Sequence, residues 1–283
     1  MRVLITGASG FVGGALTSLL GRKNVEVFAL IRSNLTEFQI KYPKVKIIQG
    51  NLESITAREL DALKIDTLVH LAWENVNKVM LDTHLEHLNV QKIFMEKVFD
   101  SNISKILISG SCFEYGKIEG EIDVATKPNP NTNYGIAKNE LKNWMLNYWT
   151  KSKKNVKISW MRVFYVYGEN QHERSLYSQL MTSIEEKRSE FDMSRGFQIR
   201  DFIKIDEVAE NFYEEIGFER PGFKIRNICS GNPISVREFV EKLLSDNNAR
   251  MSLNLGKYAI PDYEPIAFWG RKDYTVQLNE LDS

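Results

Sequence analysis

The stretch Thr6-Gly7-Ala8-Ser9-Gly10-Phe11-Val12-Gly13 decides the fold of this 283-residue chain. It follows an aliphatic run at 2–6 and leads directly into a segment with helical spacing at 13–22. Glycines suit such a turn, because its backbone angles are unusual and its amides must approach an anion closely. A tight turn without a ligand has the same pattern, but the strand before it and the helix after it favour a dinucleotide-binding turn.

Strand-like and helix-like segments alternate through the first half of the chain. The short aliphatic or β-branched runs are 2–6, 25–31, 45–49, 65–71, 104–109 and 156–162, and the helical segments include 13–22, 84–101 and 135–150. Because strands that are apolar on both faces form parallel sheets covered by helices, the pattern predicts an α/β fold with a Rossmann-type doubly wound parallel sheet. A ligand crevice is expected at the carboxyl ends of its strands.

The pattern loosens after about residue 168. Polar loops are predicted at 169–175, 186–200, 217–223 and 245–265, around helices such as 175–188 and 235–246. We expect a smaller C-terminal lobe there. No Gly/Ser linker marks a clean boundary, so the chain can cross back between the two lobes.

Composition narrows the classes of partner and the compartment. Lys plus Arg and Asp plus Glu both number 37, so no charge excess favours a nucleic acid or an anionic membrane. Cys112 and Cys229 lack metal or redox spacing, and the four histidines form no ligand pattern, so no metal is expected. Without an apolar run of about 18 to 20 residues or a basic-apolar leader, the cytoplasm is the expected location.

The end of the second predicted strand bears on the choice of cofactor. An Asp or Glu would bind the ribose 2′-hydroxyl of NAD there, but the sequence has Arg32 and Ser33. A guanidinium can pair with a 2′-phosphate and a serine can donate to it, which favours NADP(H) over NAD(H). An exposed arginine at a strand end is the alternative, and NAD(H) remains possible.

Three residues form a candidate catalytic set. Tyr134 and Lys138 stand four apart near the start of the helical segment 135–150, so they share one face. A nearby cation stabilises a phenolate and lowers its pKa, which makes the tyrosine usable as an acid-base group. Ser111 ends the strand-like segment that includes 104–109, where a substrate carbonyl would lie, and it can hydrogen-bond the oxygen whose charge changes.

With these motifs the chain resembles the extended short-chain dehydrogenase/reductase superfamily, in particular its nucleotide-sugar epimerase/dehydratase/reductase branch. The resemblance covers nearly the whole chain. Its further landmarks are Asn51-Leu52, Leu71-Ala72-Trp73, Asn89-Val90, the segment from Arg162 to Gly168, Arg200-Asp201-Phe202-Ile203, Asp206 and Val208.

The resemblance implies a role for each matching residue. Cofactor contacts are implied for Gly7, Gly10, Phe11, Val12, Gly13, Arg32, Ser33, Asn51, Leu52, Leu71, Ala72, Trp73, Ser109, Tyr134, Lys138, Val163 and Phe164. Substrate contacts are implied for Ser111, Cys112, Phe113, Tyr165 and Arg200. Arg200 would hold a nucleotide diphosphate, or alternatively would pair with its neighbour Asp201. Residues 1–168 would then form the NADP(H)-binding catalytic domain and residues 169–283 the nucleotide-sugar-binding lobe.

Departures from the family pattern narrow the reaction. Sugar-nucleotide 4,6-dehydratases carry an acidic pair where this chain has Cys112 and Phe113, which disfavours dehydration, although Glu114 follows. Arg32 departs from the acidic residue typical of NAD-retaining epimerases. A net reductase that uses NADPH fits better. The short C-terminal lobe, with Pro265 to Arg271 near its end, resembles bacterial reductases that act on nucleotide-linked 4-keto-6-deoxyhexoses in surface-polysaccharide synthesis.

Two other functions stay open. One is an NAD(P)-dependent epimerase or 4-dehydrogenase acting on the same substrate class, and the other is a non-enzymatic NADP(H) sensor or scaffold. The family analogy also implies a homodimer formed by two helices per subunit, around 84–101 and 135–150.

Overall fold

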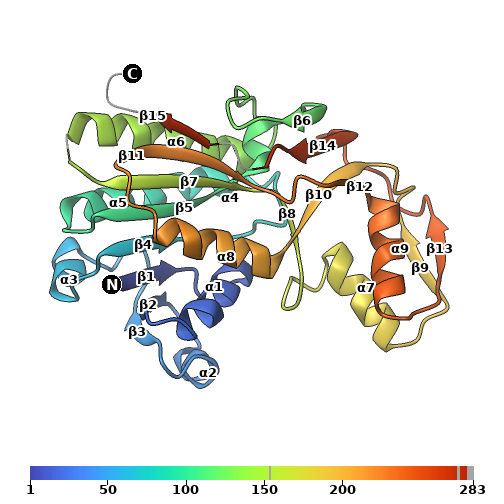
Figure 1. Ribbon diagram of the computed structural model, residues 1–283, viewed down its shortest axis with the longest axis horizontal. Helices are drawn as coiled ribbons and strands as arrows, with labels where there is room; N and C mark the ends of the chain where they lie inside the picture. The colour runs from blue at the N-terminus through green and yellow to red at the C-terminus, as the bar shows by residue number, and fades with distance from the viewer. Residues whose placement is uncertain (153, 273–274, 279–283) are drawn as a thin grey trace.

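The computed structural model describes residues 1–152, 154–272 and 275–278, and an eight-stranded sheet forms its larger part (Figure 1). The sheet order is β15-β11-β7-β5-β4-β1-β2-β3. The strands are β1 (Arg2–Thr6), β2 (Glu26–Ile31), β3 (Lys46–Gln49), β4 (Thr67–His70), β5 (Lys105–Ser111), β7 (Lys157–Val163), β11 (Gly222–Ile228) and β15 (Thr275–Leu278). All neighbours in this order pair in parallel except β11 and β15. The order reverses between β1 and β4, as the predicted doubly wound fold requires, and that prediction is confirmed.

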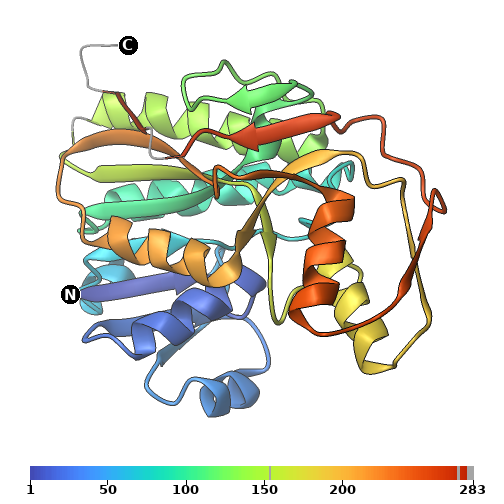
Figure 2. The ribbon, with the colours of Figure 1, turned by 45° about the vertical axis from the view of Figure 1, so that its right-hand side comes forward.

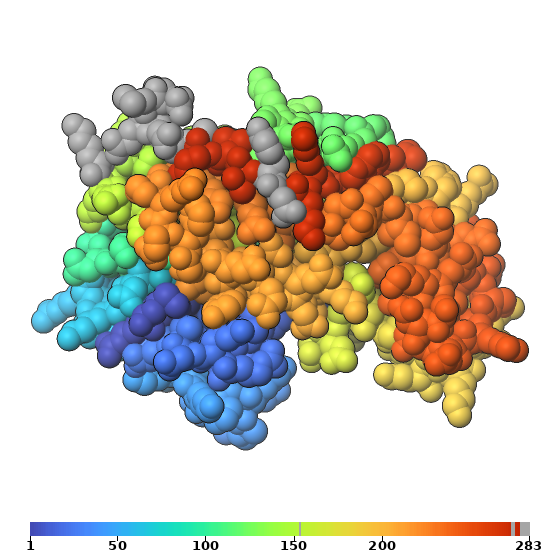
Figure 3. Space-filling model, viewed as in Figure 1, coloured from blue at the N-terminus to red at the C-terminus, as the bar shows by residue number. Residues whose placement is uncertain are grey.

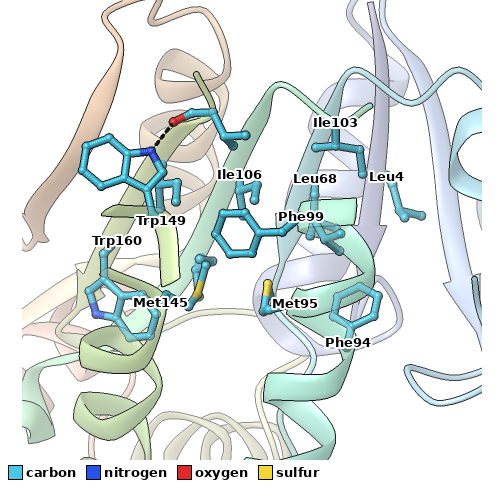
Figure 4. Packing of buried hydrophobic residues seen from close by; sticks show 14 of the residues in the cluster. Leu4, Leu68, Phe94, Met95, Phe99, Ile103, Ile106, Met145, Trp149 and Trp160 are labelled. Atoms are coloured by element: carbon cyan, nitrogen blue, oxygen red, sulfur yellow. Dashed lines mark hydrogen bonds between the residues drawn. The ribbon is translucent and has the colours of Figure 1, made fainter. Parts of the chain in front are cut away.

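Both faces of this sheet are buried because the strands are apolar at nearly every position. Leu4 points to one face, against Phe94 and Met95 of α5 (Leu88–Asp100), while Val3 and Ile5 point to the other. The first face also packs on α3 (Ala57–Ala62) and α6 (Asn133–Ser152). The second face packs on α1 (Phe11–Gly21), α2 (Leu35–Lys41) and α8 (Ile205–Ile216). Figure 4 shows the first cluster, in which the Trp149 indole N–H donates to the Val156 carbonyl at 3.0 Å.

The smaller lobe lies beyond the carboxyl ends of the strands (Figure 2). Its larger sheet contains β8 (Tyr165–Tyr167), β10 (Ile199–Lys204), β12 (Pro233–Ser235) and β14 (Ala267–Gly270), together with β6 (Gly120–Ile122) from the first half. Its outer part consists of α7 (Leu176–Glu185), β9 (Glu190–Met193), α9 (Val236–Asp246) and β13 (Ser252–Leu255). Phe191, Leu180 and Phe239 form the centre of the core of this outer part.

The chain crosses back between the lobes, as the sequence analysis allowed: α8 and β11 follow residue 168 but return to the first sheet, where β11 pairs with β7. The structure differs from the sequence prediction in two respects. The segments 186–200 and 245–265 are not wholly loops, since β9 and β13 pair within them. The helix expected at 84–101 is divided at His87 into α4 (Thr83–Glu86) and α5.

Candidate active site

The turn after β1 is so tight that two of its glycines have no room for a side chain. Gly7 has a φ of +72°, and a Cβ there would lie 2.7 Å from the Ala72 amide nitrogen. A Cβ on Gly13 would lie 2.0 Å from the Gly7 carbonyl oxygen. The two glycines therefore let the backbone close into this turn, and the first turn of α1 carries no acidic residue that would repel an anion.

A groove of about 500 Å³ runs over this turn and along the ends of β2, β3 and β4. Its lining includes the predicted residues Gly7, Gly10, Arg32, Ser33, Asn51, Leu52, Leu71, Ala72 and Trp73. The other predicted cofactor residues lie outside that lining: Phe11 lines a second groove of about 410 Å³ beside α1, and Val163 and Phe164 are buried. Figure 3 shows the surface hollowed between the blue first part of the chain and the smaller lobe.

A closed circuit of hydrogen bonds lies beneath the groove. The Ala72 amide donates to the Thr6 hydroxyl at 3.4 Å, and that hydroxyl lies 2.8 Å from His70 Nδ1. His70 Nε2 lies 2.6 Å from the Gln91 side-chain oxygen, and the Gln91 amide donates to the Ala72 carbonyl at 3.3 Å. Burial lowers the pKa of His70 to about 3, so the ring is neutral and donates from Nε2. The circuit fixes Ala72 at the groove wall.

Arg32 does not stand alone at the end of β2. Its guanidinium donates to the Glu74 carboxylate at 2.7 Å, and both residues line the groove. The sequence analysis named Arg32 but not Glu74, because only the fold brings these two loops together.

Ser111, Tyr134 and Lys138 converge at the end of β5. Ser111 begins a short 3-10 helix, η1 (Cys112–Tyr115), and its hydroxyl accepts from the Phe113 amide at 3.2 Å. Burial raises the pKa of Tyr134, partly offset by a hydrogen bond from Ser111, so the phenol is protonated. The sequence analysis expected Lys138 to lower this pKa, but burial outweighs any such effect and raises it.

Lys138 is buried among groups that hold its position. Its Nζ donates to the Ser109 carbonyl at 2.7 Å and lies 4.0 Å from the centre of the Trp73 ring. Burial lowers the pKa of Lys138 to about 7. The Trp73 indole N–H in turn donates to His84 Nδ1 at 3.0 Å, a contact that the sequence analysis did not anticipate.

Glu114 is fully occupied by a structural role. Its carboxylate pairs with Arg162 at 2.8 Å and accepts from the Trp160 indole at 2.9 Å and from the Ser111 amide at 2.8 Å. All four residues are buried. Removing a buried partner of such a pair is costly, so this carboxylate fixes the turn that carries Ser111 and is not positioned to act on a substrate.

The four predicted substrate residues other than Ser111 lie near Tyr134 or near its neighbours. The centre of the Phe113 ring lies 6.2 Å from that of Tyr134 and 6.3 Å from that of Tyr165. The Arg200 guanidinium lies 5.2 Å from the Tyr165 ring, and burial raises the pKa of Cys112. These contacts bring both lobes to one site.

The alternative prediction, that Arg200 pairs with Asp201, was wrong. Arg200 pairs with Glu264 at 2.5 Å, whereas the Asp201 carboxylate accepts from the amides of Ser230, Gly231 and Gly270. Glu264 precedes β14 and is remote in sequence, so no local pattern could have identified it.

A membrane-spanning helix and a metal-binding cluster are both absent from the part of the chain that the structure describes. No helix in residues 1–152, 154–272 and 275–278 is long and apolar enough to span a bilayer. In that same part of the chain, no three His, Cys, Asp or Glu side chains gather as a metal site would require.

Comparison with known proteins supplies a family. A family model described as "NAD dependent epimerase/dehydratase family" matches residues 3–216. The chain is 26% identical over 274 residues to the dTDP-6-deoxy-L-talose 4-dehydrogenase (NAD(+)) of Aggregatibacter actinomycetemcomitans, covering 96% of this chain and 100% of that protein. It is 24% identical over 285 residues to the CDP-abequose synthase of Yersinia pseudotuberculosis, covering 96% of each.

Solved structures share the fold. MoeE5 in complex with UDP-glucuronic acid and NAD superposes with a TM-score of 0.81 at 23% identity, covering 96% of this chain and 90% of that chain. The UDP-glucuronic acid 4-epimerase from Bacillus cereus, in complex with UDP-glucuronic acid and NAD, gives a TM-score of 0.77 at 21% identity, covering 96% of this chain and 90% of that chain.

Proposed function

The chain belongs to the NAD dependent epimerase/dehydratase family, and we propose that it is an NADPH-dependent reductase of a nucleotide-linked 4-keto-6-deoxyhexose. Its relatives are nucleotide-sugar dehydrogenases, dehydratases and epimerases. One observation carries the choice of reduction: Ser111, Tyr134 and Lys138 stand together, while Cys112 and Phe113 occupy the positions where a dehydratase needs acids.

The groove over the glycine turn fits a dinucleotide. The tight turn that Gly7 and Gly13 permit, at the start of α1, suits a pyrophosphate, and the groove extends from there past Arg32 and Ser33 to Asn51. When bound, NADPH supplies the hydride. Arg32 favours NADP(H), and NAD(H) is the alternative cofactor, which is named for three of the compared proteins.

The protein's own residues handle the proton. The Ser111 hydroxyl donates a hydrogen bond to the substrate's carbonyl oxygen as negative charge develops there. Tyr134 transfers its phenolic proton to that oxygen, and protonated Lys138 stabilises the phenolate that remains. The substrate contacts Cys112, Phe113, Tyr165 and Arg200. The guanidinium of Arg200 is released from Glu264 and binds the diphosphate of the substrate.

The name of one relative also supports a second function in the same substrate class. A 4-dehydrogenase runs the same reaction backwards with the same three residues, and one relative bears that name. An NAD(P)-dependent epimerase is the related alternative, in which the cofactor stays bound between two opposite hydride transfers.

We test the proposal by mixing the purified protein with NADPH or NADH and a panel of nucleotide-linked 4-keto-6-deoxysugars, following absorbance of the reduced nicotinamide. Stoichiometric oxidation with one sugar supports the reductase. A rearranged sugar without net oxidation of NADPH indicates an epimerase and contradicts the proposed reductase.

Two further parts of the proposal are a cytoplasmic location in bacterial surface-polysaccharide synthesis and a homodimer formed through α5 and α6.

A further inference from the structure

The ion pair between Arg32 and Glu74 lies where the groove would receive the adenosine ribose. We propose that Glu74 sets how strongly this groove discriminates NADP(H) from NAD(H), because its carboxylate competes with a 2′-phosphate for Arg32. This inference rests on the proposed dinucleotide binding. It assigns a specificity role to a residue on a different loop from the one that carries Arg32.

The sheet topology brings the two side chains together. β2 and β4 both pair in parallel with β1, so their carboxyl ends flank the glycine turn on opposite sides. Arg32 follows β2 directly, and Glu74 lies four residues after the end of β4. Their side chains meet at 2.7 Å across the groove, and both line it.

The charge of the group at the 2′ position determines how the Arg32–Glu74 ion pair affects the binding of each dinucleotide. A 2′-phosphate carries close to two negative charges and binds a guanidinium through paired hydrogen bonds. To bind Arg32 it must displace the Glu74 carboxylate, which costs the free energy of the ion pair. The neutral 2′-hydroxyl of NAD(H) does not compete for the guanidinium, so the ion pair stays intact when NAD(H) binds. Glu74 therefore weakens the preference for NADP(H) that Arg32 alone would give.

The size of the effect follows from exposure. The Arg32 and Glu74 side chains are 72% and 50% exposed, so water and salt screen the pair. Loss of an exposed ion pair of this kind changes a binding constant by roughly two- to five-fold. Glu74→Gln keeps the size of the side chain and removes its charge, so this variant isolates the effect.

The experiment measures dissociation constants of NADPH and NADH by fluorescence titration at one fixed salt concentration. The variants are Glu74→Gln, Arg32→Ala, the double variant, and Glu53→Gln as the control. Glu53 lines the same groove, but the structure pairs Arg32 with Glu74. We expect Glu74→Gln to tighten NADPH binding about two- to five-fold relative to NADH. In the Arg32→Ala background the same substitution should leave the ratio of the two constants unchanged.

Three results would overturn the inference: an unchanged ratio in Glu74→Gln, an equal change in Glu53→Gln, or a change that persists without Arg32. The second would indicate a general effect of groove charge, and the third a direct contact of Glu74 with the ligand. Failure of the unmodified protein to bind either dinucleotide would contradict the proposed function itself, and the inference with it.

Discussion

Tyr134 and Lys138 show how burial sets the protonation of the groups that would handle the proton. Burial raises the pKa of the tyrosine and lowers that of the lysine to about 7, in each case disfavouring the charged form. A reductase needs a protonated tyrosine before the reaction and a charged lysine beside it afterwards. The pair as folded supplies the first condition at all ordinary pH values and the second only below about pH 7.

Replacing Tyr134 by Phe should separate chemistry from binding. The variant loses the proton donor but keeps the ring packed against Trp73 and Phe113, so NADPH oxidation should fall by roughly 10²- to 10⁴-fold while the affinity for NADPH stays nearly unchanged. Tyr148→Phe, farther along α6, is the control and should retain turnover. Equal losses of turnover and affinity in Tyr134→Phe would contradict the acid role.

The pH profile of kcat/KM for reduction should reveal Lys138. Its ammonium is present below about pH 7 and is lost as the pH rises through that value, so the rate should be level at lower pH and decline above it. A guanidinium stays charged throughout this range. If Lys138→Arg is active, its profile should therefore lack the decline. A decline of the same midpoint in Lys138→Arg would show that another group titrates.

The site residues that sequence could identify are those carried by local patterns. Ser111, Tyr134 and Lys138 stand at fixed offsets from a strand end or a helix start, and the structure brings them together. The contacts of Glu74, His84 and Glu264 could not be predicted, because the partner of each residue lies in a different loop, helix or strand. A lone acidic residue in a loop carries no signal of the arginine that the fold places beside it.

At the scale of elements, the βα rhythm predicted the central strands to within about two residues at each end. The signal was strong there because each strand is apolar at nearly every position, which only a doubly covered parallel sheet requires. β9 and β13 were missed because each has only four residues in which polar and apolar positions alternate, so neither shows a continuous apolar run. The break at His87 was missed because apolar residues continue at helical spacing through it.

The turn into α1 allows a comparison within a single helix. Gly13→Ala places a methyl 2.0 Å from the Gly7 carbonyl, so we expect a loss of about 1–3 kcal/mol in the free energy of unfolding and weaker NADPH binding. Gly21→Ala meets nothing within 4 Å at the other end of α1 and should stabilise the protein by up to about 1 kcal/mol. Urea unfolding and NADPH titration of both variants measure these effects. Unchanged stability and binding in Gly13→Ala would show that the turn relaxes freely.

At the scale of the whole molecule, the chain leaves the first sheet after β7, returns with α8 and β11, leaves again and returns once more with β15. The sequence could not locate this crossing, because α8 and β11 look like any helix and strand, and only the unpaired edge of β7 requires them. The resemblance to the extended short-chain dehydrogenase/reductases is confirmed by the family match and the fold. The homodimer and the assignment of roles to the two lobes remain proposals.

The surface of α5 and α6 carries the argument for a homodimer. Ile93 on α5 is 41% exposed, and Trp144 and Tyr148 on α6 are only partly covered, with their rings 5.2 Å apart. The rings of Phe99 on α5 and Tyr148 on α6 pack together, with their centres 4.8 Å apart. A stable interface needs about 800 Å² from each partner and gains most from such apolar and aromatic anchors.

Ile93→Glu should therefore shift the protein from dimer to monomer, since a carboxylate buried at the interface would lack a partner. A cost of about 2 kcal/mol, typical of an interface anchor, corresponds to roughly a 30-fold weaker association. Sedimentation equilibrium over a range of protein concentrations measures this shift. Ile40→Glu is the control, because Ile40 is 77% exposed on α2, a different helix, and should leave the association unchanged. An unmodified protein that is monomeric at all concentrations, or two variants that weaken association equally, would contradict an interface on α5 and α6.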